Sequence, residues 1–278
     1  MRIAFLLQRS RPDQPGASLS AVTLDIIERL RARGARVDLL VPEDRPLDCA
    51  DLVGEPRHDV YVLKAKTALT LGIAGAMAAG GARVVNTFEA SSLTRDKLAS
   101  TAVLAGFGVP VPPSFATGEA HLLRRLLAGG PLWLKPPRGS QGAGVQRLAS
   151  AADLATSDAL TVDAHALPVP LFAQAEVPSG GFDLKVYVVG EQMWAIRRPF
   201  PARSLAEKLG TPARVSPPIR DAALACGQAL GLELYGVDFL VAGDEFFVVD
   251  VNAFPGYKGI PEAPAAIADY LSSSGAVA

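Results

Sequence analysis

Two acidic residues and an asparagine near the end of the chain have the types and spacing of a magnesium site. Asp250 and Asn252 lie two positions apart, directly after the apolar run Phe246–Val249. Alternate side chains of a strand share one face, so these two converge if the run is a strand. Asp238 lies at the start of another apolar run a short turn upstream, and we expect it on the adjacent strand. Oxygen ligands of this kind suit Mg²⁺, although the same residues could simply cap strands or begin turns.

A glycine-rich stretch follows Lys135 in the middle of the chain. Residues 139–144 combine three glycines with a serine between two apolar runs, and the candidate phosphate-binding positions are Ser140, Gly142 and Gly144. Backbone N–H groups of such a loop can contact phosphate oxygens, and Lys135 would add positive charge. The stretch lacks the Gly-Lys-Ser/Thr ending of a Walker A loop, and a strand is expected after it, unlike in the dinucleotide fingerprint. An ordinary β-turn is the alternative.

A third candidate region lies where an apolar strand breaks at Pro178. The backbone groups before this proline could read an adenine edge, and they belong to Gln174, Ala175, Glu176 and Val177. Asp183 could accept hydrogen bonds from ribose hydroxyls, and Lys185 could contact phosphates. Taken alone, these residues describe a strand, a turn and a charged strand face.

Strand and helix patterns alternate over the first part of the chain. Continuous apolar runs predict buried strands, and small or amphipathic runs predict helices between them. The predicted strands are 3–7, 37–41, 60–63 and 83–85, and the predicted helices are 18–33, capped by Ser18, and 68–79. Such alternation indicates βαβ units and a parallel sheet, so we expect a first α/β domain over residues 1–90.

The candidate residues fall in the rest of the chain, which is richer in strands. Predicted strands cover 132–135, 145–148, 171–177, 184–189, 193–197, 237–241 and 246–251. Helices are predicted at 94–105, 218–230 and 261–271. Strands with segregated helices indicate an α+β arrangement. We expect two further domains, over residues 91–172 and 173–278.

Composition limits the classes of function. The chain has 278 residues, of which 49% are hydrophobic and 20% charged, and a formal net charge of -1. This balance is ordinary for a soluble enzyme and gives no electrostatic reason to expect nucleic-acid binding. No apolar run reaches the roughly 18 residues of a membrane span. Cys49 and Cys226 are far apart and fit no metal-ligand spacing, so we expect a reducing, cytoplasmic location.

Taken in order, these motifs resemble the ATP-grasp superfamily, and most closely its RimK-like ligases. The resemblance covers roughly Thr94 to Tyr270 and is carried by Lys135 with Gly142–Val145, Phe182–Lys185, Val188–Gly190, Gly236–Asp238, Val249–Asn252 and Asn252–Gly256. These segments are similar, in turn, to a glycine-rich lid, a strand pair between lid and core, two metal-binding strands and a closing loop. The resemblance implies an ATP-grasp fold of α/β and α+β parts, preceded by a Rossmann-like (pre-ATP-grasp) parallel-sheet domain.

The resemblance also implies a role for each candidate residue. The groups that would hold ATP phosphates are Lys97, Lys135, Ser140, Gly142 and Gly144. Adenine would lie against Gln174, Ala175, Glu176 and Val177, and ribose against Asp183. The groups facing the transferred phosphoryl group would be Lys185 with Arg197 or Arg198. One or two Mg²⁺ ions, with Mn²⁺ as an alternative, would be held by Asp238, Asp250 and Asn252.

Two departures bear on the reaction. Asp250 stands where the ligases more usually carry glutamate. Val186–Gly190, Arg197-Arg198 and Asn252–Pro261 also resemble inositol polyphosphate 5/6-kinases, which share the fold but phosphorylate a hydroxyl. The loop 139–144 is ligase-like, and the lid region has no histidine to serve the kinase pattern. We therefore expect ATP-dependent carboxylate–amine ligation through an acyl phosphate with release of ADP, and keep a small-molecule kinase as the alternative.

Basic residues near the C-terminal motifs predict the nature of the acceptor. The expected floor of its pocket consists of Arg197, Arg198, Arg203, Tyr257 and Lys258, which suits an anionic small molecule or peptide. A solvated basic face is the alternative. Neither nucleic acid nor a membrane is an expected partner. A homodimer is a possible oligomeric state, because enzymes of this size are often symmetric dimers.

Overall fold

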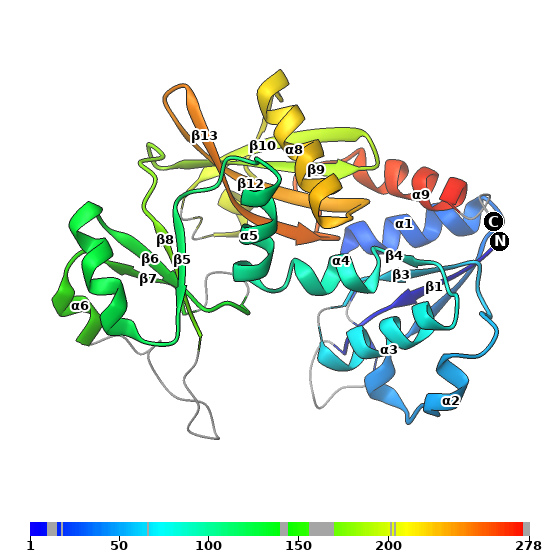
Figure 1. Cartoon of the computed structure of the whole chain (residues 1–278). Coiled ribbons are helices and arrows are strands. Elements are labelled where there is room, and N and C mark those ends of the chain that lie inside the picture. Colours follow the sequence, from blue (N-terminus) through cyan, green and yellow to red (C-terminus); the bar gives the residue numbers. More distant parts are fainter. Residues whose placement is uncertain are drawn as a thin grey trace.

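Three sheets organise the molecule. The computed structural model describes residues 1–9, 16–17, 19–65, 67–139, 144–155, 170–200, 202 and 204–274. A parallel sheet lies at one end, a small antiparallel sheet at the other, and a five-stranded antiparallel sheet between them (Figure 1). No helix within these ranges is long and apolar enough to cross a membrane.

The N-terminal sheet is parallel and has the strand order β2-β1-β3-β4. Its strands are β1 (Arg2–Leu6), β2 (Arg36–Leu40), β3 (Val60–Leu63) and β4 (Val84–Val85). Ile3 and Phe5 pack in one apolar cluster with α1 (Ala21–Ala32), whereas Ala4 and Leu6 pack in another with α3 (Ala68–Ala79). Helices on both faces explain why β1 reads as a continuous apolar run.

Two helices begin later than the sequence pattern predicts. The predicted cap Ser18 lies outside the described residues, and α1 is capped by Ser20, whose hydroxyl accepts a backbone N–H three residues on. The helix predicted from Thr94 is α5 (Lys97–Gly106), capped in the same way by Asp96. A separate short helix, α4 (Phe88–Leu93), precedes it. In both cases the side-chain oxygen that satisfies a free N–H sets the start.

The C-terminal helix completes the N-terminal lobe. Helix α9 (Ala263–Ser274) lies beside α1, on the side of the molecule where the chain enters β1 (Figure 1). Ile267 and Leu271 of α9 belong to the same buried cluster as Ile26 and Leu30 of α1. The lobe is therefore built from both ends of the chain.

The small sheet has the strand order β5-β8-β6-β7 and forms the far lobe. Its strands are β5 (Ser114–Thr117), β6 (Leu132–Lys135), β7 (Gln146–Leu148) and β8 (Leu171–Ala175). The 3₁₀ helix η2 (Ala120–Gly129) and helix α6 (Ala151–Ala155) pack on it through leucines. Because β8 pairs with β5 and β6, the predicted domain boundary after residue 172 falls inside a strand of this sheet.

The five-stranded sheet has the order β11-β10-β9-β12-β13. Its strands are β9 (Phe182–Val189), β10 (Gln192–Pro199), β11 (Thr211–Ala213), β12 (Leu234–Ala242) and β13 (Glu245–Ala253). Helix α8 (Pro217–Leu230) packs against this sheet. The remaining short helices are η1 (Pro42–Asp44), α2 (Cys49–Leu52) and α7 (Leu205–Leu209). Buried Asn86, just after β4, bonds the backbone of Glu233 and Leu234 and so ties this sheet to the N-terminal lobe.

Candidate functional site

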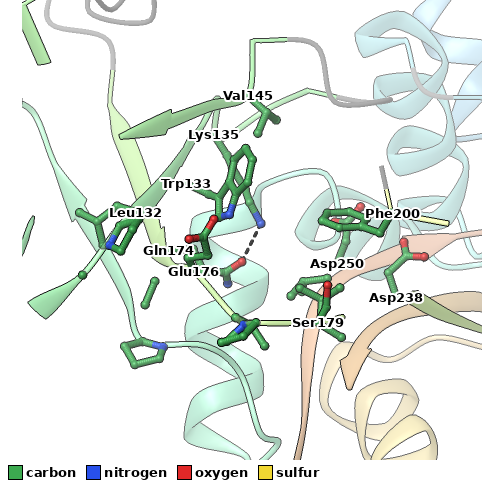
Figure 2. Close-up of a pocket in the computed structure, with 18 of the residues that line it drawn as sticks. Leu132, Trp133, Lys135, Val145, Gln174, Glu176, Ser179, Phe200, Asp238 and Asp250 are labelled. Carbon is green, nitrogen blue, oxygen red and sulfur yellow. Dashed lines mark hydrogen bonds between the residues drawn. The ribbon is translucent and has the colours of Figure 1, made fainter. Parts of the chain in front are cut away.

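A cavity of about 990 Å³ opens between the small sheet and the five-stranded sheet. Lys135, Trp133 and Gln174 project into it from β6 and β8, and Asp238 and Asp250 from β12 and β13 on the opposite side (Figure 2). Apart from Lys135, Gln174 and Glu176, the residues that line the cavity on the side of the small sheet are apolar or glycine. The facing wall carries carboxylates. The cavity is large enough for a nucleotide.

Lys135 ends β6 and points across the cavity wall to its neighbour strand. Its ammonium donates to Oε1 of Gln174 at 2.6 Å (Figure 2). The amide of Gln174 donates in turn to the hydroxyl of Ser114 at 3.1 Å. Burial, together with the charge of Lys97, outweighs the attraction of Asp250 and lowers the pKa of Lys135 to about 8. An anion in the cavity would reverse that shift.

The strand end after Gln174 offers one free backbone donor. The N–H groups of Ala175 and Glu176 donate to the carbonyls of Pro113 and Pro131. The carboxylate of Glu176 is held by Arg147 at 2.7 and 2.8 Å. Val177 also lines the cavity, and its N–H has no hydrogen-bond partner in the described part of the chain. Among the four predicted adenine-binding residues, Val177 is therefore the one with a spare N–H.

Ion pairs join three strands beneath the acidic wall. The β9–β12 register places Lys185 opposite Asp238, and its ammonium donates to both carboxylate oxygens at 2.8 and 2.7 Å. The β9–β10 register places Arg198 opposite Asp183, which it binds through two hydrogen bonds of 2.7 and 2.9 Å. Arg198 also donates to Asp238 at 2.8 Å. The cross-strand pairing thus converts the predicted residues into one network.

The charges of this network hold its arginine protonated. Burial lowers the pKa of Arg198, but the hydrogen bond to Asp183 and the charge of Asp238 outweigh burial, so its pKa lies above the ordinary value. Asp183, Lys185 and Asp238 are all nearly excluded from solvent. Both oxygens of Asp183 are committed to Arg198, so its contacts favour positioning of that arginine over the predicted ribose contact.

The three predicted metal ligands lie together. Asp238 and Asp250 are direct partners in the β12–β13 register, next to an irregularity that follows Asp238. The side-chain nitrogen of Asn252 lies 3.0 Å from Asp250 and 3.4 Å from Asp238. Two carboxylates and an amide are a donor set that fits Mg²⁺, provided the amide turns its oxygen inward. Within the described ranges, no group of three or more His, Cys, Asp or Glu side chains is placed to hold a metal ion. The role of this trio as metal ligands stays a prediction.

Two predicted residues separate in space. Arg198 lines the cavity, but its neighbour Arg197 is exposed, and its guanidinium lies 3.9 Å from the ring centre of Phe182. Adjacent strand residues face opposite sides, so only one of the pair can reach the site. Of the two arginines, Arg198 is the one that lines the cavity, and its role at the phosphoryl group stays a prediction.

Lys97 and part of the glycine-rich stretch 139–144 lie at one end of the cavity, and the structure describes only Gly139 and Gly144 of that stretch. Lys97, in the first turn of α5, donates to the carbonyl of Gly139 at 2.9 Å and lines the cavity. Gly144 has φ +72, and a Cβ there would lie 2.7 Å from Pro136, so this turn position requires glycine. Ser140 and Gly142 lie outside the described residues.

One residue of the predicted acceptor floor belongs to the core instead. Tyr257 is 1% exposed, and its hydroxyl donates to the carbonyl of Val188, so it is part of the core. Arg203 lies outside the described residues. A second cavity instead adjoins the first and includes Arg95 and Lys64, which sequence reasoning did not single out as acceptor-site residues. Arg95 stands two positions before the predicted phosphate ligand Lys97, which was the available signal.

Known proteins support one family. Residues 202–273 match the family model of the inositol 1,3,4-trisphosphate 5/6-kinase ATP-grasp domain. The chain is 32% identical over 268 residues to ribosomal protein bS6–L-glutamate ligase of Salmonella schwarzengrund, covering 86% of this chain and 87% of that protein.

Solved structures share the fold. A RimK domain ATP-grasp protein from Sphaerobacter thermophilus is 21% identical with a TM-score of 0.75, covering 98% of this chain and 100% of that one. D-alanine–D-alanine ligase from Bacillus anthracis, solved with ATP, is 17% identical with a TM-score of 0.69, covering 99% and 97%. The predicted ATP-grasp fold and the resemblance to both ligases and kinases are confirmed. The chain belongs to the ATP-grasp superfamily, as a RimK-like ligase.

Proposed function

We propose that this ligase binds ATP with Mg²⁺ in the 990 Å³ cavity and joins a carboxylate to an amine, releasing ADP. The observation that carries the proposal is the arrangement of the two walls. Lys135 ends β6 of the small sheet, and Val177 follows the end of β8. Asp238 and Asp250 lie on the opposite wall of the cavity (Figure 2). A nucleotide spanning the cavity would have its base against the apolar wall and its phosphates near the carboxylates.

The carboxylates are suited to a divalent ion and not to bare phosphates. Asp250, Asp238 and the side-chain oxygen of Asn252 would hold Mg²⁺, which would offset the negative charge of the phosphate oxygens when bound. Lys185 and Arg198 now neutralise Asp238. We infer that Arg198, which lines the cavity, stabilises negative charge on the transferred phosphoryl group. Lys185 would act indirectly, by holding Asp238 in position.

The proposed reaction has two displacements. An oxygen of the substrate carboxylate attacks the γ-phosphorus of ATP, and the bond from that phosphorus to the bridging oxygen breaks as ADP leaves. The amine nitrogen then attacks the carbonyl carbon of the acyl phosphate, inorganic phosphate leaves, and the nitrogen loses a proton. Positioning and charge stabilisation supply most of the catalysis in such transfers.

The acceptor and its partner are proposed from the relatives. The name of the bS6–L-glutamate ligase indicates that it joins an amino acid to a ribosomal protein. For this chain we propose a peptide or small-molecule acceptor that is anionic. A homodimer remains a prediction that light scattering of the purified protein would test.

The test is a substrate-dependence measurement. Purified protein with ATP and Mg²⁺ is supplied with dicarboxylic acids and acidic peptides, each with and without amino acids as amines. ADP release that requires both an acid and an amine is expected. ADP release with an acid-free polyol, giving a stable phosphate ester by phosphorus NMR, would favour the kinase alternative, which the match over residues 202–273 keeps in view.

A further inference from the structure

A second cavity, of about 310 Å³, adjoins the nucleotide cavity. It lies between the end of β3, the α4–α5 connection and the end of β13. The two cavities have just two lining residues in common within the described chain, Lys97 and Asp250. A phosphate held at this junction would therefore be accessible from both sides.

The lining of the second cavity is strongly basic. Its basic lining residues are Lys64, Arg95, Lys97 and Arg138, and its one acidic lining residue among those described is Asp250. Lys64 is committed to the carbonyls of Phe254 and Pro255, at 2.6 and 2.8 Å. Lys97 stands at the junction. Of the remaining cations, Arg138 is paired with Asp96 at 3.4 Å, which leaves Arg95 to bind a second substrate.

The guanidinium of Arg95 is not committed to a partner among the described residues. The side chain is partly buried, and it forms no ion pair or side-chain hydrogen bond with any residue that the structure describes. Arg138, in contrast, is paired with Asp96 at 3.4 Å. Burial and the neighbouring charge of Arg138 lower the pKa of Arg95. A guanidinium that is partly buried beside another cation and forms no ion pair would be stabilised by an anion that enters its cavity.

We propose that the second cavity binds the substrate through a non-reacting carboxylate held by Arg95, with Arg138 beside it. The inference rests on the proposed ligase function. A volume near the lower end of ligand pockets, about 300–1,000 Å³, suits one amino acid or the end of a peptide. The planar guanidinium of Arg95 matches a carboxylate in a two-bond geometry that lysine does not provide. The bound substrate would place its reacting group at the Lys97–Asp250 junction.

The probe is glutarate, a dicarboxylate, titrated into the full chain with Mg²⁺ and a non-hydrolysable ATP analogue. We expect calorimetric binding to wild type, and binding about tenfold or more weaker to Arg95→Gln, because a charge-assisted pair is lost. Arg95→Lys should bind with intermediate affinity. Arg220→Gln, an exposed arginine on α8, is the matched control and should bind like wild type. Thermal unfolding checks that each variant is folded.

The outcomes separate this inference from the proposed function. Neutral glutaramide should not bind to wild type, and tighter binding of L-glutamate than of glutarate would assign the carboxylate to the amine substrate. Equal or absent glutarate binding in wild type and Arg95→Gln, with analogue binding intact, would overturn the inference alone. Failure of the wild type to bind the ATP analogue would instead overturn the proposed function.

Discussion

At the scale of single residues, the site depends on cations placed against buried carboxylates. Arg198→Met leaves Asp183, which is 5% exposed, without its two-bond partner. We expect the free energy of unfolding to fall by about 3–5 kcal/mol, because a buried charge loses its counter-charge. Urea denaturation measures this change. Adding Asp183→Asn should recover part of the loss, and an unchanged midpoint for Arg198→Met would contradict the account.

A second residue-scale prediction concerns Lys135, whose pKa is lowered to about 8 from 10.5. Near pH 8 about half of these side chains are uncharged in the free protein. Bound phosphates favour the charged form, so ATP binding should take up a proton there and should weaken as pH rises further. Calorimetry in buffers of different ionisation enthalpy measures the uptake. Lys135→Met should abolish it, and an equal uptake by that variant would assign it elsewhere.

Spacing could predict that the three proposed metal ligands converge, but not which side chains contact them. Asp250 and Asn252 share a strand face at any register, so the sequence pattern was sufficient for them. The contacts of Lys185 and Arg198 depend on which residues stand opposite on neighbouring strands, and a register cannot be read from one sequence. The choice between Arg197 and Arg198 was open for the same reason.

At the scale of elements, α8 is fixed on the sheet through a glycine. A Cβ at Gly227 would lie 2.3 Å from the hydroxyl of Tyr235, which donates to the carbonyl of Ala223. Gly227→Ala should therefore lower the free energy of unfolding by about 1–3 kcal/mol, despite the better helix propensity of alanine. Gly72→Ala in α3 is the control, because a Cβ there meets nothing within 4 Å. If both variants are stabilised in urea denaturation, the close packing of α8 is wrong.

Element prediction succeeded where apolar runs were continuous or nearly so. The strand Val60–Leu63 and the helix Ala68–Ala79 have the predicted bounds, since burial and pattern agree there. Strands β5 and β11 were not predicted. Both lack a continuous apolar run and are only partly buried, and their main support is pairing with a neighbouring strand, which local sequence does not encode.

At the scale of the whole molecule, the N-terminal lobe depends on the last helix. Leu271 and Ile267 are fully buried against α1. A fragment of residues 1–90 would expose this face of α1, and we expect it not to fold on its own. Circular dichroism of the isolated fragment should show no cooperative thermal transition, whereas a sharp transition would show that the lobe is independent of α9.

The arrangement of the lobes also brings the two cavities together. The two cavities meet at Lys97 and Asp250, so phosphoryl transfer to a substrate carboxylate should occur at that junction. Asp250→Asn should reduce ADP release by about 100-fold or more, because charge stabilisation at the transferred group is lost. Exposed Asp25→Asn on α1 is the matched control.

The most direct test follows an oxygen atom. Acids from the substrate panel are labelled with ¹⁸O in the carboxylate and turned over with ATP, Mg²⁺ and an amine. Carboxylate–amine ligation through an acyl phosphate predicts that one ¹⁸O atom of each carboxylate appears in the released inorganic phosphate, by mass spectrometry. Turnover of the labelled acid into amide with unlabelled phosphate, or transfer of the phosphoryl group to a hydroxyl, would contradict the account.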